Sequence, residues 1–311
     1  MNIRIKYLLA AMVLCLGTGA AAQTFPSLLI GADAFGFSNG AASVSRMEGG
    51  FAIDQNVAGM SLNDNILDAT VAFGLWQPAY SGDKLISAGI RCKVYKGLSL
   101  GMSFRDRLQN PYQITTSTGS ASKDGSYTPK EYNLALGASY AFLPGLSAGV
   151  SFRCLRSALA PEIASTAFGV DLAFAFSRTF GRHDVGAGLS VNNLGTKLKY
   201  GENKYSQPSL VKLGASYHYI LDEKSSHVGL SAEFDALFKG GIMAGVGAEY
   251  SFRDMLFVRA GYHYGDRSKA VPSYASAGLG VKFYGISLNA SYIFASEVLS
   301  NSFGISLGYS F

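Results

Sequence analysis

Apolar residues alternate with small or polar residues along most of the chain beyond residue 66. The segment from Ile86 to Val94 is typical, because every second residue is apolar and Ser, Gly, Arg and Lys stand between them. A period of two places all the apolar side chains on one face of a β-strand. The fourteen strands predicted in this way cover residues 69–75, 86–94, 98–105, 132–140, 146–152, 168–176, 185–191, 211–219, 228–236, 242–252, 256–264, 275–283, 286–294 and 303–311.

The number of strands predicts an all-β fold, a transmembrane antiparallel β-barrel of about fourteen strands. The chain is 48% hydrophobic and 15% charged, yet beyond its N-terminus it has no apolar run of the roughly 20 residues that a membrane helix needs. In a soluble β-sandwich a second sheet would have to cover every apolar face, and fourteen strands would make an unusually large sandwich. An even count suits a closed barrel whose two ends lie on the periplasmic side of the outer membrane.

The lengths of the predicted connections support the same topology. Short connections at 95–97 and 143–145 alternate with long ones at 108–130, 157–167 and 194–209. Outer-membrane barrels have short periplasmic turns and longer external loops. The connection at 238–240 is short where a long one is expected.

The N-terminal residues predict export. Arg4 and Lys6 precede a short apolar run, which ends in small residues up to Ala22. This order is typical of a secretory signal peptide. A lipoprotein anchored at Cys15 is disfavoured, because that cysteine lies inside the apolar run. We therefore predict a signal peptide at 1–22, a plug segment at 23–66 and an outer-membrane barrel at 67–311.

The second face of each predicted strand is mainly Gly, Ser and Ala, with a minority of charged residues. Small side chains leave room in a barrel, and the glycine-rich segment 23–66 is the predicted N-terminal plug. Two pairs are expected on neighbouring strands, Arg153 with Asp171 and Arg107 with Glu131. Arg259 and Lys282 are further lumen candidates. We expect these charges to hold the wall and the plug in register rather than to bind a ligand.

No catalytic residue, metal site or cofactor is predicted, and we expect the protein not to be an enzyme. Gly-x-Ser-x-Gly occurs at 97–101, 145–149 and 304–308, but that motif needs a strand-to-helix elbow, and here it is the small face of a strand. The four histidines show no ligand spacing.

The formal charge of +5 is too small and too scattered to indicate nucleic acid. Cys92 and Cys154 fall on apolar faces, which favours lipid-facing thiols over a disulfide.

The last predicted strand alternates up to a terminal aromatic residue, Phe311. This ending resembles the strand that the barrel-assembly machinery recognises, so Phe311 is the expected assembly signal. Outer-membrane lipid and that machinery are the expected partners.

Two short segments carry a family resemblance. Residues 56–60, Asn-Val-Ala-Gly-Met, are similar to an Asn-Pro-Ala-Gly-Leu stretch before the first strand, with Val57 in place of the proline. Residues 190–195, Ser-Val-Asn-Asn-Leu-Gly, followed by Tyr200, resemble a mid-barrel Asn-Leu-Gly segment. With the strand layout from Asp68 onward, the chain resembles the PorV/PorQ group of outer-membrane barrels, relatives of the FadL fatty-acid transporters.

The resemblance implies a plug that contains Asn56 and Gly59 and a part in type IX secretion, with secretion-system proteins and secreted cargo as partners. The PorP/SprF barrels of the same route and a FadL-like transporter of hydrophobic compounds are the alternatives. A transporter of that kind should line its lumen with Leu, Ile and Phe, and the predicted inner face does not. The predicted plug disfavours a general porin.

Overall fold

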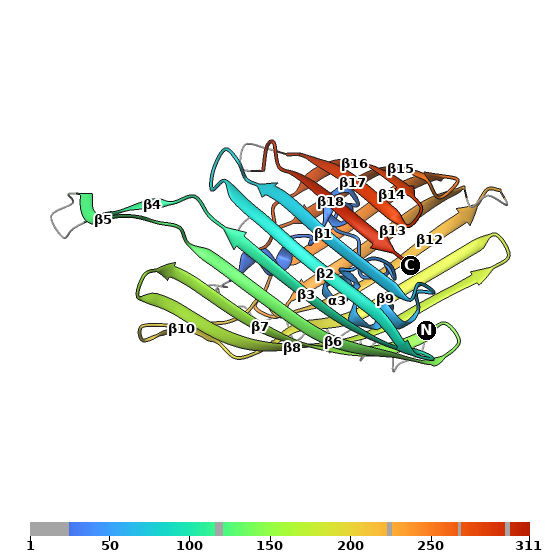
Figure 1. The fold of residues 1–311 in the computed structure, drawn as a ribbon, viewed down its shortest axis with the longest axis horizontal. Coiled ribbons are helices and arrows are strands. Elements are labelled where there is room, and N and C mark those ends of the chain that lie inside the picture. Colours follow the sequence, from blue (N-terminus) through green and yellow to red (C-terminus); the bar gives the residue numbers. More distant parts are fainter. Residues whose placement is uncertain (1–24, 116–120, 223–225, 267–268, 296–298) are drawn as a thin grey trace.

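The computed structural model describes residues 25–115, 121–222, 226–266, 269–295 and 299–311. The predicted signal peptide and its cleavage site at Ala22 lie outside the described residues. Fourteen strands close into one antiparallel barrel, in which β1 pairs with both β2 and β18 (Figure 1). The barrel strands are β1 (Leu67–Trp76), β2 (Asp83–Tyr95), β3 (Leu98–Leu108), β6 (Lys130–Leu143), β7 (Leu146–Ala160), β8 (Ile163–Phe180), β9 (His183–Gly195), β12 (Leu210–Ile220), β13 (His227–Leu237), β14 (Ile242–Phe252), β15 (Leu256–Gly265), β16 (Tyr274–Phe283), β17 (Ile286–Phe294) and β18 (Phe303–Ser310).

The alternating apolar and small residues of the sequence lie on opposite faces of the barrel wall. On β8, Phe174 is 57% exposed, whereas Ala173 and Ala175 beside it are each 2% exposed. Cys92 and Cys154 are free thiols, half-buried on the outward face. Because apolar side chains face outward all round the barrel, this surface suits the hydrocarbon core of a membrane. No helix among the described residues is long and apolar enough to cross a bilayer.

All fourteen predicted strands are confirmed, but several are longer than predicted. The predicted long connection at 157–167 is wrong, because β7 continues to Ala160 and β8 begins at Ile163. Where a strand extends beyond the membrane, its outward side chains do not need to be apolar. Arg156 is exposed on this part of β7, and its backbone still pairs with Thr166. The alternation in polarity stops before the strand does.

Two hairpins that are not part of the barrel sheet were not predicted. The connection 108–130 contains β4 (Tyr112–Thr115) and β5 (Ala121–Tyr127), and the connection 194–209 contains β10 (Leu198–Tyr200) and β11 (Asn203–Tyr205).

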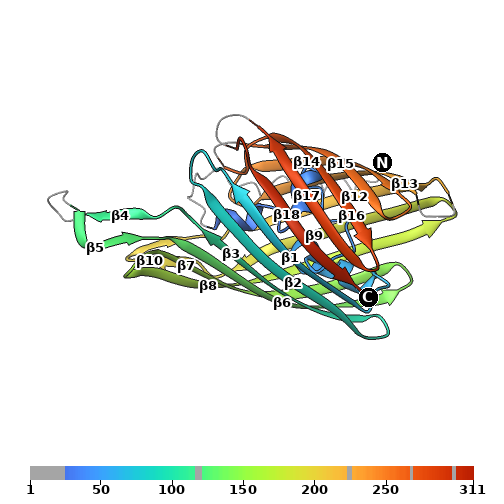
Figure 2. The same cartoon turned by 45° about the horizontal axis from the view of Figure 1, so that its top comes forward.

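The β4–β5 hairpin projects from one end of the barrel (Figures 1 and 2). We call this end the loop end. The opposite end, which carries Phe311 and tight turns at Gly97 and Gly285, is the turn end, and both glycines adopt the positive φ that such turns require.

Residues 25–66, which precede β1, lie inside the barrel (Figure 1). They contain four short helices, η1 (Pro26–Leu29), α2 (Ala34–Ser38), α3 (Ala52–Gln55) and η2 (Val57–Ser61). Helix α2 packs against β15 to β18, whereas η2 packs against β6, β7 and β8 on another part of the wall. We call residues 25–66 the plug.

The end of the chain closes the barrel seam. Strand β18 ends at Ser310, one residue earlier than predicted, but the Phe311 N–H donates to the Leu67 carbonyl at 2.9 Å. The Phe311 carbonyl accepts the Leu67 N–H at 3.0 Å, and the Phe311 side chain is exposed. The role of Phe311 in assembly stays a prediction.

Candidate functional site

Arg153 on β7 joins the plug to two strands of the wall. Its Nε lies 2.5 Å from Asp171 Oδ2 on β8, and one of its terminal nitrogens lies 2.8 Å from Asp54 Oδ1 in the plug. The structure thus brings together the predicted pair and adds a third partner. Asp171 also accepts the Asn193 N–H at 2.7 Å, which holds the bulge of β9 where Asn193 has a positive φ.

The second predicted pair forms near the loop end. The Arg107 guanidinium lies 3.1 Å from Glu131 and 2.5 Å from Asp83. Glu131 also accepts the Ser27 hydroxyl of the plug at 2.8 Å. As in the Arg153 cluster, one cation serves two carboxylates, and one of these carboxylates contacts the plug.

Charged wall residues also bind the backbone of the plug. Arg105 donates to the Ile30 carbonyl at 2.8 Å. Glu233 accepts the Val44 N–H at 2.6 Å and pairs with Lys212 at 2.6 Å. Removing one partner of such a buried pair costs about 3–5 kcal/mol, because the other charge is left without compensation. These contacts therefore fix the position of the plug.

Wall glycines let the plug approach the strands closely. A Cβ added to Gly188 would collide with the Val44 carbonyl, and one added to Gly261 would collide with the backbone of Gly40. The plug backbone therefore packs on the inner face of the strands, where the sequence has mainly Gly, Ser and Ala.

The plug candidates Asn56 and Gly59 lie at the start and middle of η2. The buried Asn56 caps that helix by accepting the Ala58 N–H at 3.0 Å, and its amide donates to the Val44 and Phe174 carbonyls. A Cβ on Gly59 would lie 3.0 Å from the Met47 sulfur. Both residues thus shape the packing of the plug.

Arg259 and Lys282 lie toward the turn end. Arg259 pairs with Glu249, donates to Asn289 at 2.8 Å and lies over the ring of Phe35. Lys282 is partly exposed and lies 3.5 Å from Asp254. Both residues line a polar cavity of about 360 Å³ between the plug and the wall.

Part of the loop end of the lumen is apolar, which corrects the prediction that large apolar side chains are missing from the inner face. Trp76 is 4% exposed, and its ring lies 5.6 Å from Phe37 of the plug and 6.3 Å from Tyr274. The prediction failed because most of these residues lie at strand ends, in loops or in the plug. Met243 and Ile293 fall within predicted strands, but the inner faces of those strands otherwise carry small or polar residues. This loop-end cluster consists of Ile30, Phe37, Trp76, Leu85, Leu210, Leu237, Met243, Val271, Tyr274, Ile293 and Leu299.

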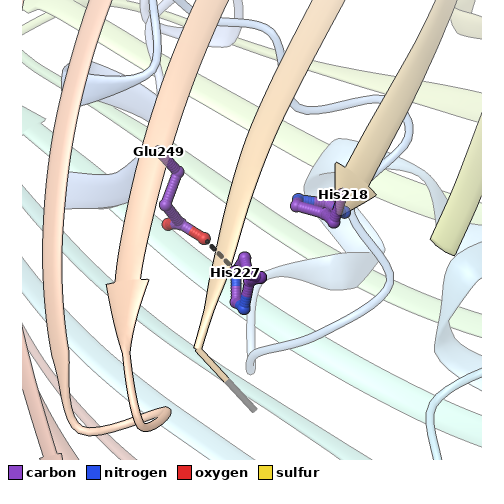
Figure 3. A group of neighbouring side chains, drawn as sticks. All are labelled: His218, His227 and Glu249. Carbon is purple, nitrogen blue, oxygen red and sulfur yellow. Dashed lines mark hydrogen bonds and ion pairs between the residues drawn. The ribbon is translucent and has the colours of Figure 1, made fainter. Parts of the chain in front are cut away.

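Two of the four histidines meet in the turn-end cavity. His218, His227 and Glu249 each offer a metal-binding atom, and these atoms lie within 4.8 Å of one another (Figure 3). His183 and His263 are not part of this group. Sequence reasoning missed this group, because the contact between its members depends on the register of three strands rather than on residue spacing.

Comparison with known proteins gives the fold. No family model and no curated protein matches the chain. Among solved structures, the Ralstonia pickettii toluene transporter TbuX is 11% identical with a TM-score of 0.61, and 91% of this chain aligns with 98% of that one. The Pseudomonas putida toluene transporter TodX is 14% identical with a TM-score of 0.60, covering 93% and 99% of the two chains. A Pseudomonas aeruginosa FadL homologue is 12% identical with a TM-score of 0.53, covering 90% and 98%.

These neighbours share the closed barrel across nearly their whole length. Outer-membrane barrels carry their longer loops on the outside of the cell, so we expect the loop end to face the exterior. The chain is an outer-membrane β-barrel with the fold of the FadL-like transporters.

Proposed function

We propose that this protein is an outer-membrane channel for small hydrophobic compounds. The observation that carries the proposal is the loop-end cluster, which gathers apolar side chains at the external mouth and rests on Phe37 and Ile30 of the plug. Burial of apolar surface is the main attraction available to an uncharged hydrocarbon. The proposal adopts the FadL-like transporter in place of the cargo-handling function favoured by the sequence.

The two ends of the lumen would interact differently with such a compound. A hydrophobic compound would bind among the rings and aliphatic chains of the loop-end cluster, and the polar turn-end cavity would hold it only weakly. The plug lies between the two, so passage requires the plug to shift locally. The toluene transporters TbuX and TodX, which share this fold, support this class of substrate.

The single tryptophan makes the proposal testable, since Trp76 is the only one in the chain and lies in the loop-end cluster. Toluene bound there should change the emission of Trp76 in a saturable way in purified protein. Ile293→Asn, which places an amide in the cluster, should weaken the response at least about tenfold, whereas Leu213→Asn on the outer face should not. No saturable response, or equal loss in both variants, would contradict the proposal.

Transport is tested separately in cells. Strains that carry Ile293→Asn at normal surface levels should take up toluene more slowly than strains with the original chain. Unchanged uptake would show that the cluster has no part in transport.

A second function, in type IX secretion, is favoured by a different feature. The β4–β5 hairpin projects beyond the barrel (Figure 2), and the rings of Tyr112 and Tyr127 pair across its base at 6.0 Å. A projecting hairpin is suited to contact a protein partner. Replacing residues 110–128 by a short glycine turn should then leave cargo proteins unexported or unattached, while toluene uptake stays normal. A normal surface proteome would exclude this function.

A further inference from the structure

We propose that the turn-end cavity holds a binding site for a transition-metal dication of the Zn²⁺ class, built from His218, His227 and Glu249. The site goes beyond the channel function and does not depend on it. Its residues come from three consecutive barrel strands, β12, β13 and β14, and all three side chains point into the lumen (Figure 3).

The strand register brings these residues together. His218 is paired with Gly229, and Gly229 is paired with Glu249 on its other side. His227 lies on the same face of β13, two residues from Gly229. Because Gly229 has no side chain, His218 and Glu249 face each other across it. The two imidazole rings are 5.2 Å apart and nearly perpendicular.

The distances are close to those of a metal site. His227 Nε2 lies 3.1 Å from Glu249 Oε1, and all three ligand atoms lie within 4.8 Å of one another. Two ligand atoms bound to one tetrahedral zinc ion lie about 3.3 Å apart, given bond lengths of about 2.0–2.1 Å. Small side-chain rotations of His218 therefore bring the third atom into range without any movement of the strands.

A neighbouring carboxylate lies beside His218. Asp184 on β9 is paired with His218, and its Oδ2 lies 3.6 Å from His218 Nδ1. The opposite edge of the ring lies over Gly229, where an added Cβ would be 2.8 Å from His218 Nε2. An acid beside one imidazole nitrogen is the usual outer contact of a metal-bound histidine, because it fixes the tautomer that presents the other nitrogen.

The charges around the site favour a cation. Glu249 and Asp184 supply two carboxylates, and Arg259, which pairs with the second oxygen of Glu249, supplies one positive charge. Glu249 Oε1 lies on the side of His227, away from that arginine contact. The cavity around these residues is polar and partly open, so a hydrated ion can reach it from the turn end.

The ligand types select the metal. Imidazole nitrogen suits Zn²⁺, Ni²⁺, Cu²⁺ and Co²⁺, whereas Mg²⁺ and Ca²⁺ prefer oxygen ligands. Two imidazoles and one carboxylate also leave a coordination position for water. A bound ion would link β12, β13 and β14 on the lumen side of the wall.

Untagged protein, folded in detergent and stripped with EDTA, tests the proposal by calorimetric titration with Zn²⁺ and by the visible absorption of bound Co²⁺. We expect one ion per chain, with Mg²⁺ and Ca²⁺ unable to compete. His218→Ala, His227→Ala and Glu249→Gln should each weaken Zn²⁺ binding by at least about tenfold and alter the Co²⁺ spectrum. Heat-dependent mobility on gels verifies that each variant is folded.

Two further variants separate a metal site from a structural ion pair. Gly229→Ala removes no ligand but displaces the His218 ring, so it should weaken binding as the ligand variants do. His183→Ala is the matched control, since His183 lies at the same end and binds the Tyr217 hydroxyl instead, and it should bind Zn²⁺ normally. Absence of stoichiometric binding, or an equal loss in His183→Ala, would overturn the proposal.

Discussion

The two ends of the lumen differ in chemistry although one set of strands builds both. At the loop end, Trp76, Leu237 and Ile293 pack against the plug with almost no exposed surface. At the turn end, Glu249, Arg259 and Lys282 surround a polar cavity. The outer wall is apolar along the same strands, so the membrane does not impose this difference. The inner residues at each end are thus free to vary with function.

The contrast between the loop end and the turn end can persist only if the plug stays fixed between them. Arg153→Ala would leave Asp54 and Asp171 buried without their shared cation, and we expect a loss of about 3–5 kcal/mol in the free energy of unfolding. Urea-induced unfolding in lipid vesicles measures it. The control is Arg156→Ala, an exposed arginine on the same strand, which should change stability little. Equal losses would show that the plug is not held by this cluster.

The apolar end is tested by removing one buried side chain. Leu237→Ala should cost about 2–3 kcal/mol in the same unfolding measurement, because it leaves a cavity in the loop-end cluster. Leu230 lies on the same strand but is 64% exposed on the outer face, so Leu230→Ala leaves no cavity and should have a smaller effect. A larger loss of stability in Leu230→Ala than in Leu237→Ala would contradict tight packing of the loop-end cluster.

At the turn end, removal of one side chain should reduce stability less than Leu237→Ala does at the loop end. Lys282→Ala removes a partly exposed pair with Asp254, so the expected loss is below about 1 kcal/mol and smaller still at high salt. Unfolding at two salt concentrations measures this. A loss that matches Leu237→Ala would mean that the two ends are equally well packed and that the contrast between them is only one of polarity.

The sequence predicted the barrel better than its interior. Alternation identified every membrane-crossing segment, since lipid requires an apolar outer face on each strand. The strands of the two loop hairpins are only three to seven residues long, too short for a sustained alternation, so β4–β5 and β10–β11 were missed. The Arg153–Asp171 pair was predictable from adjacent strands, whereas Asp54 was not, because the plug has no repeating pattern that would place it.

The remaining differences have related causes. The loop-end cluster was missed because its members are scattered over strand ends and loops. The meeting of His218 with Glu249 depends on register across β13, which residue spacing does not reveal. The strand layout predicted a barrel of this kind without distinguishing a transporter from a secretion component, since that choice depends on the lumen and the loops.

The close fit of the plug also constrains how the protein is made. The plug contacts β6 to β8 through η2 and β15 to β18 through α2, and wall glycines leave no room for it to slide past. We therefore expect residues 25–66 to lie against the sheet before β18 meets β1, so that the plug is enclosed as the barrel closes.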